Sequence, residues 1–262
     1  YIAGVEAVTA RVIQAAPQLR AISRNGSGVD NIDVEAAQRA GIQICRATGA
    51  NATGVAELTV AAVLALFRSI PQVSMALKDG HWQRQRGREL RSATVGLVGV
   101  GTIGSEVAKL MQAMAAETIG YDALVSETTI RRSGCSPASL QELLESSDVV
   151  SLHASVSQDG SPLLGRAELA LMKEGAYLVN TARASLVDEE AVLQALEDGN
   201  LAGYAVDAYS KEPPTDFRLI QHERVIATPH IGAYTRESGT RAAMAAVRNL
   251  IGCLERGKCE DV

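Results

Sequence analysis

Two kinds of periodicity alternate through the middle of the sequence, from about residue 90 to residue 230. Short apolar and β-branched runs predict strands at 93–99, 117–122, 148–152, 175–181, 201–209 and 224–230. After the first run, a helical face is predicted from the spacing of Val107, Leu110, Met111 and Met114. Strands separated by amphipathic helices imply right-handed crossovers and a parallel sheet with helices on both faces. We therefore predict an α/β fold with a doubly wound parallel sheet of the Rossmann type.

Three further helices, two in this segment and one before it, are predicted from their end signals or their apolar composition. Ser139 is followed three residues later by Glu142, which is the pattern of a capping box. Another helix is predicted from Asp188 to Gly199, because acidic residues fill its first turn and a glycine follows its last. The apolar helix at 56–68 is shorter than the roughly 20 residues that cross a bilayer, so we expect it in the core.

The segments that flank this region have their own alternation. Residues 1–53 contain two helical stretches, two strands and the glycine-rich turn RNGSGVDN between them. In the tail, one helical face is predicted to carry an apolar stripe of Met244, Val247, Ile251 and Leu254. We expect this stripe to be buried, with the tail packed on the N-terminal segment. The predicted domains are a discontinuous one, 1–53 with 235–262, and the doubly wound one, 54–234.

Composition excludes several classes of protein. Of 262 residues, 47% are hydrophobic, which predicts a folded globular chain. The 30 acidic and 25 basic residues give a net charge of −5, and the one basic run, at 84–91, is typical of a solvated face, so neither nucleic acid nor membrane is an expected partner. The cysteines and histidines lack metal-ligand spacing, so no metal site is predicted. Cysteine usage favours the reducing cytoplasm.

The motif GVGTIG at 99–104 follows a predicted strand and opens a helix. In that context Gly99 permits a tight turn, Gly101 lets the backbone approach a pyrophosphate, and Gly104 allows close helix packing. Asp122 ends the next strand, where a carboxylate accepts hydrogen bonds from an adenosine ribose and repels the extra phosphate of NADP. The motif therefore favours NAD binding over a purely structural turn, and NAD over NADP.

Four ionisable side chains follow successive strands on their carboxyl side: Arg183, Asp207, Glu212 and His230. Each alone has an ordinary explanation, since an arginine at a strand end often forms a surface ion pair and an aspartate before a turn often caps it. The carboxyl ends of parallel strands meet at one edge of the sheet, so we expect these four side chains to converge there. Their combination favours a catalytic site.

Oxidation of a 2-hydroxy acid by hydride transfer requires groups of these kinds. Imidazole titrates near neutrality, so His230 is the candidate general acid/base, and Glu212 would stabilise its charged form and fix its tautomer. Arg183 can bind a planar carboxylate in fork geometry and polarise the adjacent carbonyl. Asp207 could orient the carboxamide of nicotinamide.

On these motifs the chain resembles the NAD-dependent D-isomer-specific 2-hydroxyacid dehydrogenases, in particular their phosphoglycerate dehydrogenase-like branch. The likeness covers nearly all residues and is carried by RNGSGVDNID, AELTVAAVLALFR, GVGTIG with GYD, LVNTARASLVDEEAV, LAGYAVDAYSKEPP and TPHIGAYT. The resemblance implies a catalytic trio of Arg183, Glu212 and His230. It implies cofactor contacts at Ser27, Gly99, Gly101, Thr102, Ile103, Gly104, Asp122, Ala154, Thr181, Ala182, Asp207 and Gly232.

The resemblance also implies how the substrate and the subunits are arranged. The substrate carboxylate would be bound by Asn25, Gly26, Ser27 and Gly28 together with Arg183, within a smaller flavodoxin-like α/β domain. Two units would form a homodimer through the NAD domain. Family members have some 40 to 50 residues before the position of Tyr1, so we expect the first strand and helix of that domain to be missing from this sequence.

Some positions depart from the family pattern. Ala184 stands where glycine is usual, and no proline follows His153. The family pattern therefore does not predict the conformation of these two loops. The phosphoglycerate enzymes place an arginine near the position of Ala3 and carry a regulatory domain beyond that of Val262; this sequence has neither, which favours a small D-2-hydroxy acid other than 3-phosphoglycerate.

A protein of another class also fits the sequence. An NAD(H)-sensing corepressor of the same fold would bind the cofactor and recruit partners without turnover. The presence of all three catalytic residues favours the enzyme.

Overall fold

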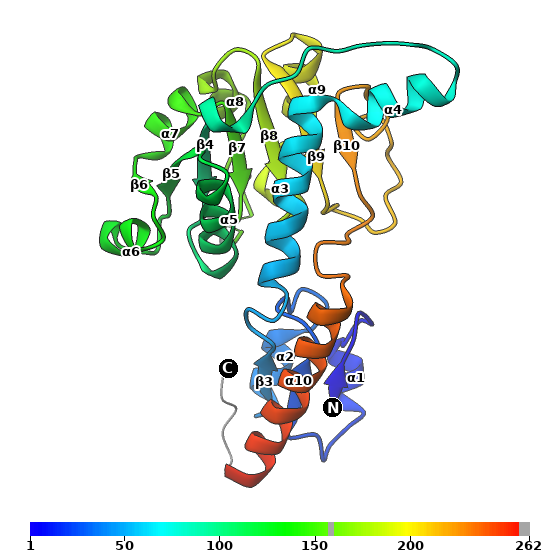
Figure 1. Ribbon diagram of the computed structural model, residues 1–262. Coiled ribbons are helices and arrows are strands. Elements are labelled where there is room, and N and C mark those ends of the chain that lie inside the picture. The colour runs from blue at the N-terminus through cyan, green and yellow to red at the C-terminus, as the bar shows by residue number, and fades with distance from the viewer. Residues whose placement is uncertain (157–159, 257–262) are drawn as a thin grey trace. The chain divides into compact units, whose positions relative to one another are not determined.

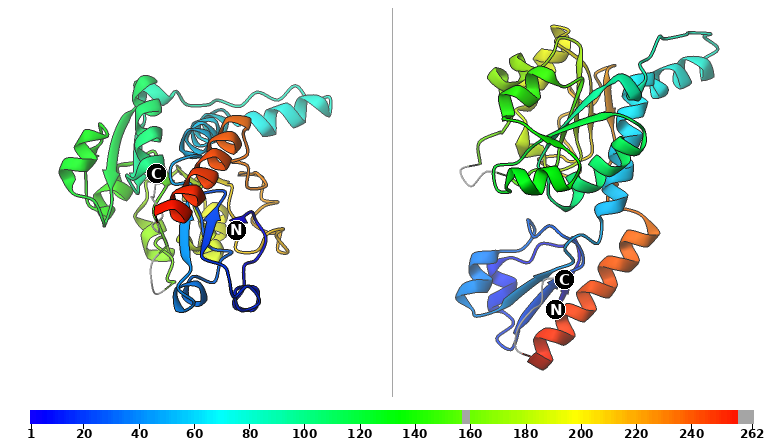
Figure 2. Two further views of the ribbon diagram at one scale, coloured as in Figure 1. Left: turned by 90° about the horizontal axis from the view of Figure 1, so that it is seen from below. Right: turned by 60° about the vertical axis from the view of Figure 1, so that its left-hand side comes forward.

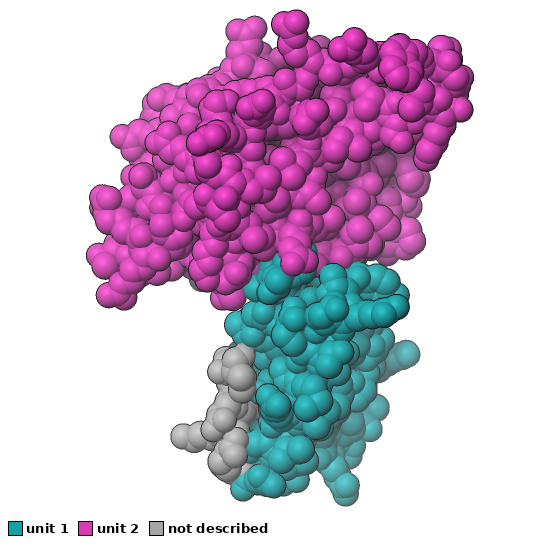
Figure 3. Space-filling model, in the orientation of Figure 1, with its two compact units in different colours: residues 1–54, 233–262 teal, residues 55–232 magenta. Residues whose placement is uncertain are grey.

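The computed structural model describes residues 1–156 and 160–256. The chain divides into two compact units, Tyr1–Gly54 with Ala233–Val262 and Val55–Gly232, which Figure 3 distinguishes by colour. The predicted boundaries, 1–53 with 235–262 and 54–234, lie within two residues of these.

The larger unit is built on a parallel sheet of seven strands (Figure 1). In chain order these are β4 (Thr94–Val98), β5 (Glu117–Tyr121), β6 (Ser136–Pro137), β7 (Val149–Leu152), β8 (Ala176–Asn180), β9 (Leu201–Val206) and β10 (Val225–Ala227). Their order across the sheet is β10-β9-β8-β7-β4-β5-β6, and neighbours pair in parallel. The chain winds outward in both directions from β4 and β7. In such sheets ligands bind at this reversal, beyond the carboxyl ends of the strands.

Helices cover both faces of this sheet. The two buried cores show which helix lies on which face: α3 (Ala52–Arg68), α5 (Thr102–Ala113) and α6 (Glu127–Arg132) contribute to one, and α7 (Leu140–Ser146), α8 (Arg166–Leu171) and α9 (Glu189–Glu197) to the other. Helix α4 (Ile70–Lys78) follows α3 after Ser69. The predicted α/β class with parallel strands is confirmed.

Helix ends lie where the sequence signals predict them. Ser139 and Glu142 form both hydrogen bonds of the capping box on α7, and Asp188 accepts from the amides of Glu190 and Ala191 at the start of α9. The sequence patterns did not predict α4, α6, α8, β1 or β6. Because α6 and α8 have six residues each and β6 has two, they show too few apolar repeats to stand out.

The smaller unit contains a three-stranded parallel sheet in the order β1-β2-β3, formed by β1 (Ile2–Ala3), β2 (Ala21–Arg24) and β3 (Gln43–Arg46). Helices α1 (Ala10–Gln14) and α2 (Val34–Arg39) connect these strands. Ile13, Ile22, Ala37 and other apolar residues form its core. The flavodoxin-like type of this unit stays a prediction.

Helix α10 (Arg236–Arg256) packs along β2 and β3, as Figure 2 shows, but not with the predicted face. The prediction that the apolar stripe is buried was wrong, because Met244, Val247, Ile251 and Leu254 are 42–51% exposed. The face against the sheet consists mainly of small and polar residues, including Ala242, Ala246, Asn249 and Cys253.

Hydrogen bonds explain why the polar face of α10 is buried. The Ser23 hydroxyl donates to the Ala246 carbonyl over 2.8 Å, and the Asn249 side-chain amide donates to the Arg46 carbonyl over 2.9 Å. Small side chains let the helix approach closely enough for these bonds, whereas an apolar stripe would hold it further away. A pattern of hydrophobic spacing contains no information about such bonds.

The described residues show neither a membrane-spanning helix nor a metal-binding cluster. No single helix there is long and apolar enough to cross a bilayer; α3 and α4 reach that length and composition only together, across a bend of 62°. Within residues 1–156 and 160–256 no group of three or more His, Cys, Asp or Glu side chains is arranged to hold a metal ion.

Candidate active site

The glycine turn lies between β4 and α5, at the reversal of strand order. Gly99 has φ +93°, and a Cβ there would lie 2.4 Å from the Ala154 amide nitrogen, so only glycine fits. A Cβ at Gly104 would lie 2.1 Å from the Gly99 carbonyl oxygen. By contrast, a Cβ at Gly101 would meet no atom within 4 Å. The turn therefore has close packing at its two ends and open space at its middle glycine.

The first turn of α5 adjoins that open space. Gly101 is the N-cap of the helix, and no side chain in the described part of the chain caps it. The amides of Thr102, Ile103 and Gly104 are therefore not satisfied by a capping side chain there. A helix N-terminus of this kind favours a negatively charged group. The arrangement fits the pyrophosphate of a dinucleotide.

Asp122 directly follows β5 and is bound to the same turn. One carboxylate oxygen accepts a 2.8 Å hydrogen bond from the Val100 amide, and the other accepts from the amides of Leu124 and Val125. A carboxylate has about four acceptor positions, so one is left for a ribose hydroxyl. The side chain thus has a fixed place beside the turn.

The loop after β8 carries three of the predicted residues and is held by Asn180. This fully buried side chain donates to the Arg183 carbonyl over 2.8 Å and accepts from the Ala182 amide over 3.1 Å. The Thr181 hydroxyl lies 2.9 Å from that of Thr59 on α3. The Arg183 guanidinium donates to the Ala182 carbonyl. Asn180 and Thr59 were not predicted as site residues, although a buried polar residue at the end of an apolar strand is a usable signal.

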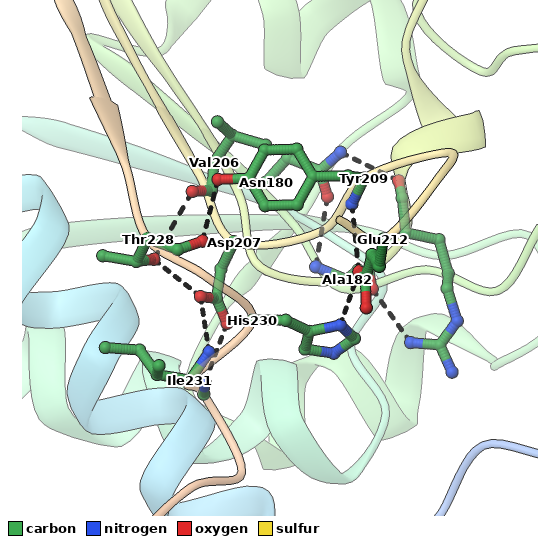
Figure 4. A network of polar contacts seen from close by, with 11 residues as sticks. Asn180, Ala182, Val206, Asp207, Tyr209, Glu212, Thr228, His230 and Ile231 are labelled. Carbon is green, nitrogen blue, oxygen red and sulfur yellow. Dashed lines mark hydrogen bonds and ion pairs between the residues drawn. The ribbon is translucent and has the colours of Figure 1, made fainter. Parts of the chain in front are cut away.

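His230 and Glu212 come from different loops and form a pair. Nδ1 of His230 lies 2.7 Å from Oε1 of Glu212, and both side chains are nearly half exposed. The Tyr209 amide donates to the same carboxylate oxygen over 3.3 Å. Figure 4 shows the pair close to Ala182, the neighbour of Arg183. The larger unit thus brings together the loops that carry the three predicted catalytic residues.

Asp207 follows β9 and is only 2% exposed. Its carboxylate accepts hydrogen bonds from the Thr228 hydroxyl (2.6 Å) and from the amides of Ile231 (2.8 Å) and Gly232 (2.7 Å) (Figure 4). These contacts lie within the protein, and the predicted contact to nicotinamide is not tested by them.

The loop after β7 lies against the glycine turn. His153 is mostly buried, and its Nε2 is 2.9 Å from the Ser151 hydroxyl. Its buried Nδ1 has no hydrogen-bond partner among the described residues, 1–156 and 160–256. Burial lowers the pKa of His153 to about 4, so the ring is neutral at pH 7. Ala154 forms the wall against Gly99, as described above.

In the smaller unit, the predicted substrate loop follows β2. The Asn25 amide donates to the Ala3 carbonyl, and the Gly26 carbonyl accepts from the Ala47 amide. The Ser27 hydroxyl donates to the Ala47 carbonyl (3.1 Å) and lies 3.0 Å from the Asn51 side chain. With Gly28, these residues form one connected loop within their own unit.

Comparison with known proteins places the chain in a family. Residues 60–232 match the sequence profile described as "D-isomer specific 2-hydroxyacid dehydrogenase, NAD binding domain". D-3-phosphoglycerate dehydrogenase of Sus scrofa is 42% identical over 236 residues, which are 89% of this chain and 44% of that protein. The chain thus spans about half the length of the curated relatives it matches.

Solved structures agree with this match. A glyoxylate reductase from Paecilomyes thermophila superposes with a TM-score of 0.87 at 32% identity, covering 96% of this chain and 77% of that one. A D-lactate dehydrogenase from Aquifex aeolicus, complexed with NAD and lactic acid, superposes with a TM-score of 0.86 at 29% identity, covering 98% and 82%.

The chain belongs to the D-isomer specific 2-hydroxyacid dehydrogenase family, and residues 60–232 match the family's NAD-binding domain. This is a family of NAD-dependent oxidoreductases that act on a CH–OH group. The predicted family and its cofactor, NAD, are confirmed.

Proposed function

We propose that this protein is an NAD-dependent dehydrogenase that interconverts a small D-2-hydroxy acid and its 2-oxo acid. The observation that carries the proposal is the His230–Glu212 pair, which lies at the carboxyl edge of the larger sheet beside the loop of Arg183. Strand order and the glycine turn, both typical of dinucleotide-binding domains, support it.

His230 is proposed as the general acid/base. Its Nδ1 faces a carboxylate at 2.7 Å, so the hydrogen on Nδ1 is donated to Glu212 and Nε2 is left to exchange a proton with substrate. During oxidation Nε2 takes the hydroxyl proton of the 2-hydroxy acid, and during reduction it returns a proton to the carbonyl oxygen. The negative charge of Glu212 stabilises the imidazolium that forms.

Arg183 is proposed to bind the substrate carboxylate and to polarise the carbonyl. A guanidinium offers several donors in a planar fork, which matches a carboxylate. Asn180 holds the main chain at Arg183 and Ala182 in place. The amides of Asn25–Gly28 are proposed to bind the same carboxylate, so that the smaller unit supplies the substrate-binding loop.

NAD is proposed to lie along the glycine turn with its pyrophosphate at α5. Bound NAD supplies the hydride acceptor. The open space at Gly101 and the uncapped α5 fit the pyrophosphate, and Asp122 fits the adenosine ribose. Contacts from Ser27, Ala154, Thr181, Asp207 and Gly232 are proposed from the family resemblance.

The activity is tested by following NADH absorbance at 340 nm with a panel of 2-oxo acids. Phosphohydroxypyruvate, pyruvate, glyoxylate and sulfopyruvate cover phosphate, methyl, hydrogen and sulfonate substituents. Turnover of at least one is the expected result, with the D-isomer as product where the 2-hydroxy acid formed is chiral. NADH binding without turnover of any of them would contradict the enzyme and favour an NAD(H)-sensing binding protein. The same panel decides whether 3-phosphoglycerate or another acid is the substrate.

We further propose that two copies form a homodimer through the larger unit. Apolar side chains on α4 and the segment after it are exposed, among them Met75 (65%), Leu77 (56%) and Trp82 (81%). Several large apolar side chains exposed along one short segment favour a protein interface there. Sedimentation at micromolar concentration is expected to give a dimer, and Trp82→Glu to weaken it; a monomeric parent protein contradicts the proposal.

A further inference from the structure

Asp207 makes three hydrogen bonds to one short loop. The loop runs from Thr228 to Gly232 after β10, and the buried carboxylate accepts from the Thr228 hydroxyl and from the amides of Ile231 and Gly232. His230 lies between these contacts in sequence. One negatively charged side chain therefore binds the Thr228 side chain before the proposed acid/base and the main chain directly after it.

His230 has a backbone conformation that needs such support. Its φ is +53°, in the left-handed region, which is unfavourable for a residue with a side chain. Its amide donates to the Thr228 carbonyl over 2.9 Å, which closes a tight turn. Without bonds to Asp207, the amides of Ile231 and Gly232 would lose their partner, and the turn would have less to hold it.

The contacts occupy most of the carboxylate. Oδ1 accepts from Thr228 and Ile231, and Oδ2 accepts from Gly232, so about three of four acceptor positions are used inside the protein. A single position on Oδ2 is left for a cofactor. Burial of a charged group at 2% exposure is unfavourable unless it is well hydrogen-bonded, and these three donors, all on the histidine loop, satisfy that need.

We propose that Asp207 is a positioning residue for catalysis, which fixes the left-handed turn at His230 and so aims the imidazole at Glu212. This inference rests on the proposed role of His230 and adds a second carboxylate to it. Glu212 contacts the ring itself, whereas Asp207 acts on the backbone that carries the ring. Proton transfer depends steeply on the position of the acid/base, because an error of about 1 Å can reduce the rate about 100-fold.

Asp207→Asn tests the inference with little change in shape. A carboxamide keeps one acceptor oxygen and presents an NH₂ group in place of the other, so at least one loop donor faces another donor. The ring of His230 is followed by NMR in the protein without cofactor, with its signals assigned by comparison with His230→Gln. We expect the His230 signals to move and kcat with the best 2-oxo acid to fall about 10- to 100-fold.

The outcomes are separable from each other and from the proposed function. Unchanged His230 signals in Asp207→Asn, or an unchanged kcat, would overturn the inference. If NADH binding alone weakened and the His230 signals stayed in place, Asp207 would serve the cofactor and not the histidine. If the parent protein turned over no substrate, the proposed function would fail, while the NMR comparison would still decide whether Asp207 positions His230.

A matched control and a second variant complete the test. Asp148→Asn removes a carboxylate that accepts from the Thr94 amide at the opposite end of the sheet, and it should leave the His230 signals and kcat unchanged. Should Asp207→Asn not fold, Gly232→Ala tests the same contact, because its methyl would lie 3.0 Å from Oδ2 of Asp207. Movement of the His230 signals in that variant supports the inference, and their constancy overturns it.

Discussion

The side-chain amide of Asn180 donates a 2.8 Å hydrogen bond to the main-chain carbonyl of Arg183, three residues further along the chain. The same side chain accepts from the Ala182 amide, and it is fully buried at the end of β8. The loop that carries the proposed substrate-binding guanidinium is therefore held by one residue that never needs to touch substrate.

Asn180→Ala should impair both stability and catalysis. It leaves the Arg183 carbonyl and the Ala182 amide without their partner, which costs about 1–3 kcal/mol of unfolding free energy. We expect kcat/KM for the 2-oxo acid to fall at least about tenfold, because the guanidinium is no longer held in place. Urea unfolding and steady-state kinetics measure the two effects. The exposed Asn200→Ala is the control, and equal kinetics in both variants would contradict the role.

Glu212 and His230 should behave as one unit. His230→Ala is expected to lower kcat at least about 100-fold, and Glu212→Gln at least about tenfold, with NADH affinity unchanged in both. Because Glu212 acts through the imidazole, the double variant should be no slower than His230→Ala by more than about twofold. Steady-state rates and NADH fluorescence titration provide the numbers. Multiplicative losses in the double variant would show that Glu212 works independently of the ring.

Two glycines of the same turn should respond in opposite ways to alanine. A Cβ at Gly101 meets nothing within 4 Å, so Gly101→Ala should change the unfolding free energy by no more than about 0.5 kcal/mol. The added methyl occupies the space proposed for the pyrophosphate, and the Kd for NADH should rise at least about tenfold. Gly99→Ala instead combines φ +93° with a 2.4 Å clash and should destabilise the fold. Unchanged NADH affinity in Gly101→Ala would exclude the proposed cofactor position.

The sequence could predict those site residues whose side chains directly follow the carboxyl ends of the parallel strands. The topology of parallel strands brings Glu212 and His230 to one edge, so their approach follows from the order of elements alone. The bonds from Asp207 to the amides of Ile231 and Gly232 could not be foreseen, because they depend on the backbone of a loop and main-chain amides have no sequence signature. Asn180 offered a signal, as a polar residue that ends an apolar strand, but its bonds to main-chain atoms of Ala182 and Arg183 could not be foreseen.

The elements of the fold also differ in how well the sequence predicts them. Long amphipathic helices and apolar strands were predicted, as α5 and β4 illustrate, because several apolar residues repeat in each. The short helix α8 was not, since six residues complete fewer than two turns. The predicted orientation of α10 was wrong, because hydrogen bonds to Ser23 and Arg46, and not hydrophobicity, determine which face contacts the sheet.

His153 should make the stability of the protein depend on pH. Its pKa is lowered by burial to about 4 in the folded state, whereas a histidine in the unfolded chain has a pKa near 6.5. Its contribution to stability is complete above about pH 6.5 and is lost as the pH falls toward 4, because only the unfolded chain binds a proton in that window. Between pH 7 and pH 5 we expect a loss of about 2 kcal/mol from this group.

Urea unfolding of His153→Gln at both pH values isolates that loss, since carboxylates act equally in parent and variant. The difference in unfolding free energy between pH 7 and pH 5 should be smaller in His153→Gln by about 2 kcal/mol. The exposed His81→Gln is the control and should keep the slope of the parent protein. If both variants kept it, the ring of His153 would not be the group responsible.

The packing face of α10 can be tested by substituting one residue from each side. Ala246 is fully buried and its carbonyl accepts from Ser23, so Ala246→Leu forces extra methyl groups between the helix and β2. We expect this change to lower the unfolding free energy by about 1–3 kcal/mol. Met244 is 49% exposed, and Met244→Gln should change the unfolding free energy by no more than about 0.5 kcal/mol. Urea titration followed by circular dichroism measures both, and the reverse ranking would show that the apolar stripe, and not the small-residue face, lies against the sheet.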